Sequence, residues 1–274
     1  MTRHRGRRRI VTALVLAAIA GAGIWLAIEW RGRGPDQASV DDAIDRFRAS
    51  STSVPTGDLG DRPLPGVYEY DGSGREHLSF LSTDQEQGPV LPATVTLDGD
   101  RCWDFALEYN SFHRQKWHWC LDDTGVVETG GRVEQAFDFG AMVVDERSTS
   151  VCDPPFVVVR RTVKAGDSWT KRCDTTSETT ETRTVSTGTI EFVGSEVLTI
   201  GSVEQPTVHY RIIATLSGEQ TGDDRFDLWF TTDRYLLVRG DRELRVVSPA
   251  PAPLDEVTYT ESGTWTLRSL EPQR

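Results

Sequence analysis

Apolar residues follow two patterns along this chain, and each pattern predicts a different structure. Residues 10–28 form a run of nineteen residues without a charged side chain. From Val67 onward, apolar and polar residues instead alternate with a period of two, in runs separated by Gly, Asp and Pro. The first pattern predicts one hydrophobic helix. The second predicts an antiparallel β domain over residues 67–270, because successive side chains of a strand point to opposite faces.

The uncharged run is long enough to cross a membrane. At a rise of ~1.5 Å per residue it reaches about 28 Å, close to the ~30 Å hydrocarbon core of a bilayer. Arginines are concentrated in residues 1–9, so we expect this tail to be cytoplasmic and the chain after residue 28 to be extracytoplasmic. Trp25 and Trp30 fall at the outer membrane interface, which indole rings favour. A cleaved signal peptide is the alternative, since residues 18–20 (Ala-Ile-Ala) fit a cleavage site.

Residues 29–66 predict a juxtamembrane linker with one short helix. Ser39 and Asp42 have the spacing of a capping box, with Asp in place of Glu. Ala43, Ile44 and Phe47 then form an apolar stripe, which predicts a helix over residues 40–49. Prolines and glycines follow between residues 55 and 66 and predict an irregular spacer.

The alternating region predicts ten to twelve strands. Residues 208–216, 226–230 and 257–267 show the clearest alternation. We expect a mainly β fold with one curved antiparallel sheet, closed as a barrel, open as a half-barrel, or stacked as a sandwich. The threonine-rich residues 174–189 suit a solvent-facing strand, and a glycosylated or irregular loop is the alternative.

The segment around Asn110 predicts a hairpin with a defined register. If Asn110-Ser111-Phe112 is a three-residue turn, Cys102 faces Cys120, and charged residues pair on that same face. On the other face aromatic residues then pair with each other, as in Trp103 with Trp119, and a slip of one residue would destroy both patterns. This register predicts a disulfide between Cys102 and Cys120. The two remaining cysteines then pair as Cys152–Cys173, as is typical of an oxidising compartment.

The aromatic face of this hairpin is the strongest candidate for a binding surface. Four aromatic residues share it: Trp103, Phe105, Trp117 and Trp119. Packing in the core explains such a face, and an apolar ligand or a sugar would also stack on it. These four residues are therefore the candidate ligand-facing aromatics.

Charge and composition exclude some partners. Residues 1–33 carry a net charge of +6 and residues 34–274 one of −18. A domain this acidic repels phosphate backbones, so we expect no nucleic-acid partner. Three lysines accompany 27 arginines, a bias of GC-rich genomes, and we expect an actinobacterial source.

No pattern of residues indicates catalysis, a metal or a cofactor. The chain contains no Cys-x-x-Cys, no HExxH and no phosphate-binding loop. His113 and His118 fall on opposite faces of their predicted strand, so we expect no shared metal. Asp122-Asp123 and Asp223-Asp224 lie at predicted turns, where carboxylates are normally solvated. We therefore expect a protein that is not an enzyme.

The second half of the chain resembles uncharacterised bacterial exported β-rich proteins. The resemblance covers residues ~160–245. It rests on the turn Gly166-Asp167-Ser168-Trp169, on a predicted pair of strands within residues 196–214, and on the two apolar segments 227–230 and 235–239. Such proteins are similar to the half-barrels of bacterial lipoprotein carriers and mycobacterial lipid-binding lipoproteins. The resemblance implies a curved sheet and lipid handling. It brings no functional residues, and this chain has no cysteine near its start to carry a lipid.

Together these patterns predict a single-pass protein of the cell membrane with an extracytoplasmic β domain. We expect a non-enzymatic binding module for an apolar envelope ligand, such as a lipid, or for an envelope protein. A structural or assembly subunit of an envelope complex is the first alternative. An exported hydrolase that uses an acid pair is the second.

Overall fold

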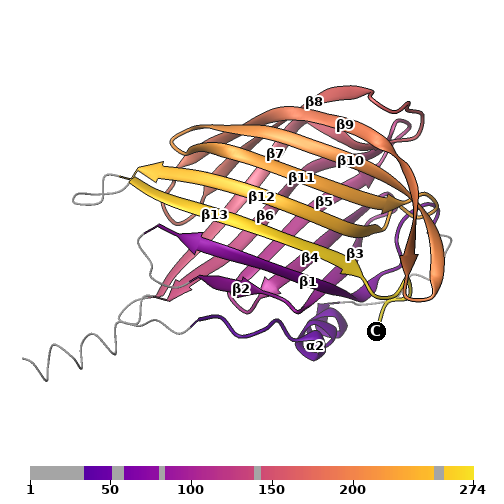
Figure 1. The fold of residues 1–274 in the computed structure, drawn as a ribbon, viewed down its shortest axis with the longest axis horizontal. Coiled ribbons are helices and arrows are strands. Elements are labelled where there is room, and N and C mark those ends of the chain that lie inside the picture. Colours follow the sequence, from indigo (N-terminus) through magenta and orange to yellow (C-terminus); the bar gives the residue numbers. More distant parts are fainter. Residues whose placement is uncertain (1–33, 51–58, 80–83, 139–142, 250–255) are drawn as a thin grey trace, which may run out of the picture. The chain divides into compact units, whose positions relative to one another are not determined.

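The computed structural model describes residues 34–50, 59–79, 84–138, 143–249 and 256–274 (Figure 1). The chain forms two compact units: Pro35–Gln135 with Glu146–Arg274 make up the larger one, and Ala136–Asp145 belong to the smaller. No helix in these described ranges is long and apolar enough to cross a membrane. The predicted membrane helix at 10–28, with Trp25 and Trp30, lies outside them.

One helix and thirteen strands follow each other along the described chain. The helix is α2 (Val40–Ser50). The strands, in chain order, are β1 (Gly66–Leu78), β2 (Gln85–Gln87), β3 (Val90–Asp98), β4 (Cys102–Asn110), β5 (His113–Leu121), β6 (Gly125–Asp138), β7 (Val143–Arg160), β8 (Ser168–Ser177), β9 (Arg183–Ile200), β10 (Val203–Gly218), β11 (Thr221–Thr231), β12 (Leu237–Pro249) and β13 (Glu256–Leu267).

The strands form a closed antiparallel barrel. From β3 to β13, each strand pairs with the next one along the chain. β1 closes the ring, because residues 70–78 pair with residues 259–267 of β13. The other edge of β1 pairs first with β3 and then with β2, so these two short strands occupy one position in the ring. The barrel therefore has twelve strand positions. The prediction of a mainly β fold with a curved antiparallel sheet is confirmed, and of the predicted alternatives the sheet adopts the closed barrel.

The register places the inward-facing residues in successive layers. Residues that pair across an antiparallel sheet share a face, and buried residues such as Tyr210, Ile212 and Ala214 mark the inner one. One layer is aromatic and apolar, with glycines: Tyr210, Leu228, Gly240, Trp265 and Gly72. A layer further along is largely polar: Lys171, Gly188, Ala214, Asp224, Leu244, Glu261 and Glu76. The barrel interior thus changes from apolar to charged along its axis.

The apolar half is filled by aromatic rings. Trp265 is 1% exposed and meets Tyr70 and Phe226 edge to face, with ring centroids 5.6 and 6.0 Å away. A Cβ on Gly240 would lie only 2.2 Å from the Trp265 ring, so the indole occupies the space that this glycine leaves. Ile200, at the far end of β9, is 2% exposed and belongs to the same core. This half of the barrel is therefore a packed core.

Helix α2 packs on the outer wall of the barrel. It occupies Val40–Ser50, where the sequence predicts a helix over 40–49. The Ser39 hydroxyl accepts a hydrogen bond from the Asp42 backbone N–H at 3.1 Å, which caps the first turn. Ala43, Ile44 and Phe47 are buried together with Val67 of β1. On the exposed side, the Arg46 guanidinium lies 2.6 Å from the Glu108 carboxylate of β4. The helix is thus part of the barrel unit.

The hairpin of β4 and β5 has the predicted register up to its turn. Cys102 pairs with Cys120, Trp103 with Trp119 and Asp104 with His118. The predicted three-residue turn is wrong: Asn110 pairs directly with His113. The Asn110 side-chain oxygen accepts the Phe112 backbone N–H at 2.8 Å, which tightens the turn, and Tyr109 forms a bulge.

Both predicted disulfides are confirmed, as Cys102–Cys120 and Cys152–Cys173. The threonine-rich residues 174–189 lie in the end of β8, a turn and the start of β9, with most of them at least partly exposed. This is the solvent-facing strand that the alternation predicts.

Candidate functional site

The polar half of the barrel interior is the most unusual feature of the molecule, because charged side chains are rarely buried unless they are paired. A continuous set of hydrogen bonds and ion pairs crosses the lumen here. Its members come from β1, β2, β5, β6, β11, β12 and β13: Glu76, Gln87, His113, Gln115, Gln135, Asp224, Arg242, Tyr259 and Glu261. We call this set the lumen network.

Glu76 and His113 form the most deeply buried pair of the lumen network. His113 Nδ1 lies 2.8 Å from Glu76 Oε1, and the two side chains are 2% and 1% exposed. Gln87 and Gln135 also donate hydrogen bonds to the Glu76 carboxylate, at 3.0 and 2.5 Å. Each carboxylate oxygen therefore has a donor, as a buried charge requires.

This arrangement shifts both pKa values. Burial alone would raise the pKa of Glu76, but the charge and hydrogen bond of His113 outweigh it and lower that pKa below its usual range. Burial alone would lower the pKa of His113, but the charge and hydrogen bond of Glu76 outweigh it and raise that pKa. Each member of the pair therefore favours the charged form of the other.

Arg242 occupies the centre of the lumen network. Its Nε and Nη2 donate to the two oxygens of Asp224, each at 3.2 Å, and its Nη1 donates to Gln115 at 2.6 Å. Glu261 lies 3.8 Å from the same guanidinium. Burial would lower the pKa of Arg242, but the charges of Asp224 and Glu261 outweigh it and raise that pKa. One cation thus pairs with two carboxylates.

A further carboxyl group lies beside the buried disulfide. The Trp119 indole N–H donates to Glu128 Oε2 at 3.1 Å. Burial raises the pKa of Glu128, while the charge of Lys171 opposes the shift. Lys171 faces the same lumen, since it pairs with Gly188 in the polar layer.

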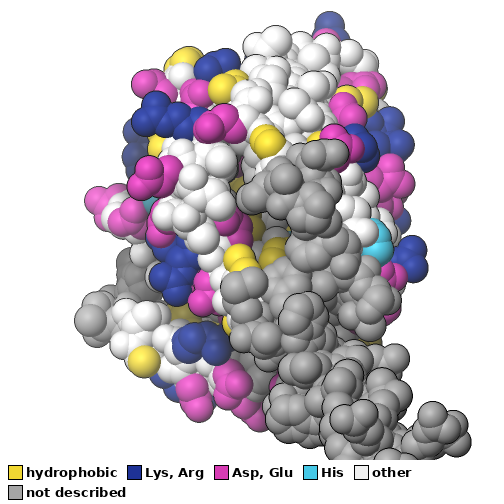
Figure 2. All heavy atoms as spheres, turned by 90° about the vertical axis from the view of Figure 1, so that its left-hand side faces the viewer, with side chains coloured by type: hydrophobic (Ala, Val, Ile, Leu, Met, Phe, Trp, Pro, Cys, Tyr) yellow, Lys and Arg dark blue, Asp and Glu magenta, His cyan; other side chains and the backbone are white. Residues whose placement is uncertain are grey.

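Solvent reaches part of this polar half. Lys171, Gln115 and Asp224 all face inward, yet each is partly exposed, and the Asp224 side chain is 14% exposed. In Figure 2, basic and acidic side chains are interspersed over the visible described surface at the left-hand side of Figure 1, and hydrophobic ones form separate spots. Lys171 and Asp224 thus place both signs of charge on the inner wall.

The lumen network gives a testable pH dependence. Because the pKa of His113 is raised in the folded protein, its protonation stabilises the fold. This stabilisation is complete below the ordinary pKa of 6.5 and is lost as the pH rises through the pKa of the folded state. Because the pKa of Glu76 is lowered in the folded protein, its ionisation also stabilises the fold. This stabilisation is complete above the ordinary pKa of 4.5 and is lost as the pH falls through the pKa of the folded state.

We therefore expect the pair to stabilise the barrel most between pH 4.5 and 6.5. Urea unfolding from pH 4 to 9 measures the effect. The Glu76→Gln/His113→Gln variant should lose the decline above pH 6.5. The His77→Gln variant should keep it, because His77 is 45% exposed. An unchanged decline in the double variant would contradict the assignment.

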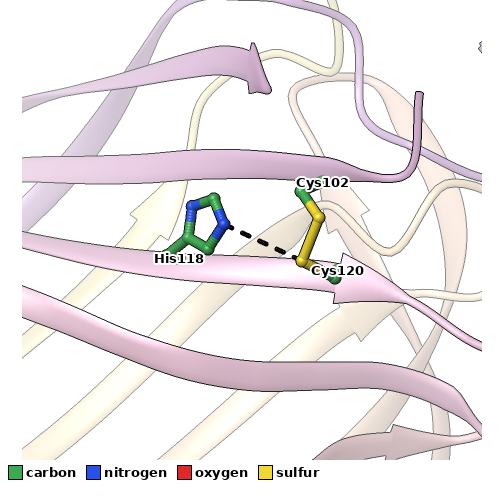
Figure 3. A group of neighbouring side chains, drawn as sticks. All are labelled: Cys102, His118 and Cys120. Carbon is green, nitrogen blue, oxygen red and sulfur yellow. Dashed lines mark hydrogen bonds between the residues drawn. A yellow bond between two sulfur atoms is a disulfide. The ribbon is translucent and has the colours of Figure 1, made fainter. Parts of the chain in front are cut away.

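A second group of interacting polar side chains lies on the outer wall. His118 Nε2 is 3.8 Å from Cys120 Sγ of the Cys102–Cys120 disulfide (Figure 3). His118 Nδ1 lies 2.7 Å from Asp104 Oδ1, and Asp104 Oδ2 accepts from Lys116 Nζ at 2.8 Å. With both sulfurs joined to each other, the three side chains do not offer a set of metal ligands.

The outer wall also carries an open hollow of about 480 Å³ between β1, β2, β12 and β13. Its lining is polar and of mixed charge: Ser73, Gly74, Arg75, Glu86, Asp241, Arg242, Glu243, Ser262, Gly263 and Thr264. Gly74 and Gly263 pair with each other in this hollow, and a Cβ on either would meet the buried Gln87 side chain.

The structure places the four candidate ligand-facing aromatics inside the barrel. Trp103, Phe105, Trp117 and Trp119 are 0%, 0%, 7% and 1% exposed. Phe105 stacks on Trp119 at 5.6 Å, and Trp119 meets Phe230 edge to face at 5.5 Å. This is the packing that a core role predicts, and contact with a ligand stays a prediction.

Sequence reasoning missed the lumen network. Its members are separated by up to 185 positions between Glu76 and Glu261, so no local motif joins them. One signal was present: the inward-facing series Tyr68, Tyr70, Gly72, Gly74 on β1 continues to Glu76. A charged residue at a core position of an alternating strand indicates a buried partner.

Comparisons with known proteins assign no family. No family model matches the chain, and a search of the curated proteins finds no match. Among solved structures, the chain is similar to the crystal structure of the hypothetical lipoprotein YmcC from Escherichia coli (K12). The identity is 11%, the TM-score is 0.34, and the match covers 83% of this chain and 97% of the other. At this level of similarity the match transfers no activity.

Proposed function

We propose that this chain is a single-pass, membrane-anchored protein whose extracytoplasmic barrel is a non-enzymatic binding module. The uncharged run at 10–28 supplies the anchor in the cytoplasmic membrane, and the two disulfides suit an oxidising compartment. The ligand is a small polar or charged molecule that enters the polar half of the barrel. The observation that carries this proposal is the partly exposed inner wall with Lys171, Gln115 and Asp224.

A polar ligand fits this barrel better than a lipid. The aromatic residues that would contact an acyl chain are packed against one another and are at most 7% exposed. Small-molecule sites commonly combine a closed apolar floor with a few convergent polar groups. The apolar layer around Trp265 is such a floor, and the lumen network supplies the polar groups.

Binding also fits better than hydrolysis. The Asp224 carboxylate is held by Arg242, and the Glu76 carboxylate by His113 and two glutamines. A general acid–base pair needs a group that can exchange its proton with a substrate. Each of these carboxylates instead already accepts hydrogen bonds from side chains of the barrel itself.

Native mass spectrometry tests the proposal on the full chain, produced in an oxidising host and extracted in mild detergent. We expect a small water-soluble molecule bound at one per chain. Lys171→Gln, which changes the inner wall, should reduce its occupancy. Arg172→Gln is the matched control, because Arg172 is the next residue of β8 and faces outward, 53% exposed.

Three outcomes would overturn this assignment. A stoichiometric lipid would show an apolar site. A stoichiometric protein partner, without a small molecule, would make the chain an assembly subunit. A bare chain whose stability does not respond to candidate polar ligands would remove the binding role.

A further inference from the structure

The two disulfides of this protein have different surroundings. Cys152 and Cys173 face the barrel interior and are 2% and 4% exposed. Cys102 and Cys120 lie on the outer wall of β4 and β5, and both are partly exposed. Thiol–disulfide exchange depends on access to the sulfur and on how readily the leaving thiolate departs. Access alone therefore favours reaction at Cys102–Cys120.

The leaving sulfur of the outer disulfide has a proton donor beside it. His118 Nε2 lies 3.8 Å from Cys120 Sγ, and Figure 3 shows the imidazole beside the disulfide. The hydrogen bond from Nδ1 to Asp104 fixes the imidazole with its Nε2 edge toward the sulfur. The His118 side chain is 28% exposed, so it can exchange protons with solvent.

Charged groups from three neighbouring strands face this imidazole. Asp98, at the end of β3, lies 3.7 Å from Nε2. Asp104 comes from β4, and Lys116 from β5 neutralises it at 2.8 Å. Two carboxylates and one amine thus lie around the imidazole, on a domain of net charge −18, and this net charge disfavours an anionic reactant.

We propose that Cys102–Cys120 is an exchange-active disulfide that takes up small uncharged or cationic thiols, with His118 as its proton donor. A thiolate, formed when the thiol loses its proton to solvent, attacks Cys102 Sγ and forms a new S–S bond. The Cys102–Cys120 bond breaks, and its electron pair goes to Cys120 Sγ. The protonated imidazole of His118 gives its Nε2 proton to that sulfur and then regains one from solvent. The incoming thiol is oxidised to a mixed disulfide, and Cys120 is reduced to a thiol.

Asp104 has a different role in this step. It does not touch the sulfurs but holds the imidazole through Nδ1, so it is a positioning residue. The neutral Asp104→Asn variant keeps a hydrogen-bonding group of the same size. We expect it to slow exchange less than the loss of His118 itself.

The first measurement compares the two disulfides within one molecule. The full chain, oxidised and held in detergent, is treated with cysteamine, 2-mercaptoethanol or 3-mercaptopropionate at equal thiolate concentration. Alkylation and peptide mass spectrometry then report each cysteine. We expect Cys102–Cys120 to open at least about tenfold faster than Cys152–Cys173, because only the former is accessible. Cysteamine and 2-mercaptoethanol should open Cys102–Cys120 faster than 3-mercaptopropionate does, because its carboxylate adds a negative charge.

The second measurement assigns the proton donor. His118→Gln should slow opening by about tenfold or more, within reach of what a general acid contributes. It should also flatten the pH profile that remains after correction for thiolate concentration, which a purely structural role would not do. His77→Gln is the matched control, since His77 contacts Asp84 at 2.7 Å in the same way but on β1.

The interior disulfide serves as a check on folding, because its opening rate should be the same in all variants. Equal opening rates for the two disulfides in the wild-type chain would overturn the proposal. So would a His118→Gln variant with an unchanged rate and pH profile.

Discussion

Replacing Arg242 with methionine should lower the free energy of unfolding by about 3–5 kcal/mol at neutral pH, the usual effect of removing one partner from a buried ion pair. The guanidinium is 10% exposed and forms ion pairs with Asp224 and Glu261, which are 14% and 2% exposed. Without it, two carboxylates face each other in the lumen with no cation between them. Urea denaturation of the oxidised protein at pH 7 measures the change.

Two controls isolate the cause. Arg172→Met removes an ion pair with Asp174 in which both side chains are more than half exposed, so it should cost less than about 1 kcal/mol. Adding Asp224→Asn and Glu261→Gln to Arg242→Met should restore part of the loss, because no buried charge is then left alone. If Arg242→Met costs no more than Arg172→Met, the lumen network is fully solvated and does not stabilise the barrel.

Trp265→Ala should also lower the free energy of unfolding by about 3–5 kcal/mol, because it leaves a cavity at the centre of the apolar layer. The indole is 1% exposed, and its neighbours Tyr70 and Phe226 are held in the barrel wall and cannot follow it inward. Thermal and urea unfolding both report the loss. Val197→Ala, at a site 60% exposed, should change stability little and serves as the control.

A double-variant cycle checks that Trp265 acts through the space above Gly240. Gly240→Ala alone should cost about 1–3 kcal/mol, because its Cβ would overlap the indole. In a chain that already carries Trp265→Ala, Gly240→Ala should lower the free energy of unfolding by much less, because the indole that its Cβ would overlap is gone. Additive losses would show that the two sites are independent and that the proposed packing is wrong.

The β4–β5 hairpin shows what local sequence can determine. Its register was predictable because two independent patterns, cysteines with charges and aromatics with aromatics, agree on one alignment. The length of the turn was not predictable, because it depends on one hydrogen bond between the Asn110 side chain and the Phe112 backbone N–H. A pattern over many residues survives such a local change, whereas a single turn does not.

The choice between barrel, half-barrel and sandwich could not be made from the sequence, because each has the same alternation along every strand. What decides it is the pairing of β1 with β13, between segments almost the full domain apart. The lumen network depends on the same pairing, since Glu76 and Glu261 lie opposite each other across that seam. A long-range seam therefore creates both the closed fold and the candidate site.

The same seam determines the order in which the barrel can form. β1 is the first strand to leave the ribosome and β13 the last, so β1 holds an open edge until nearly the whole domain has been synthesised. Such distant pairings are slow to form, and an unpaired edge invites association with other chains. A chain that stops before residue 256 would keep two open edges, on β1 and β12, and should aggregate rather than fold as a smaller barrel.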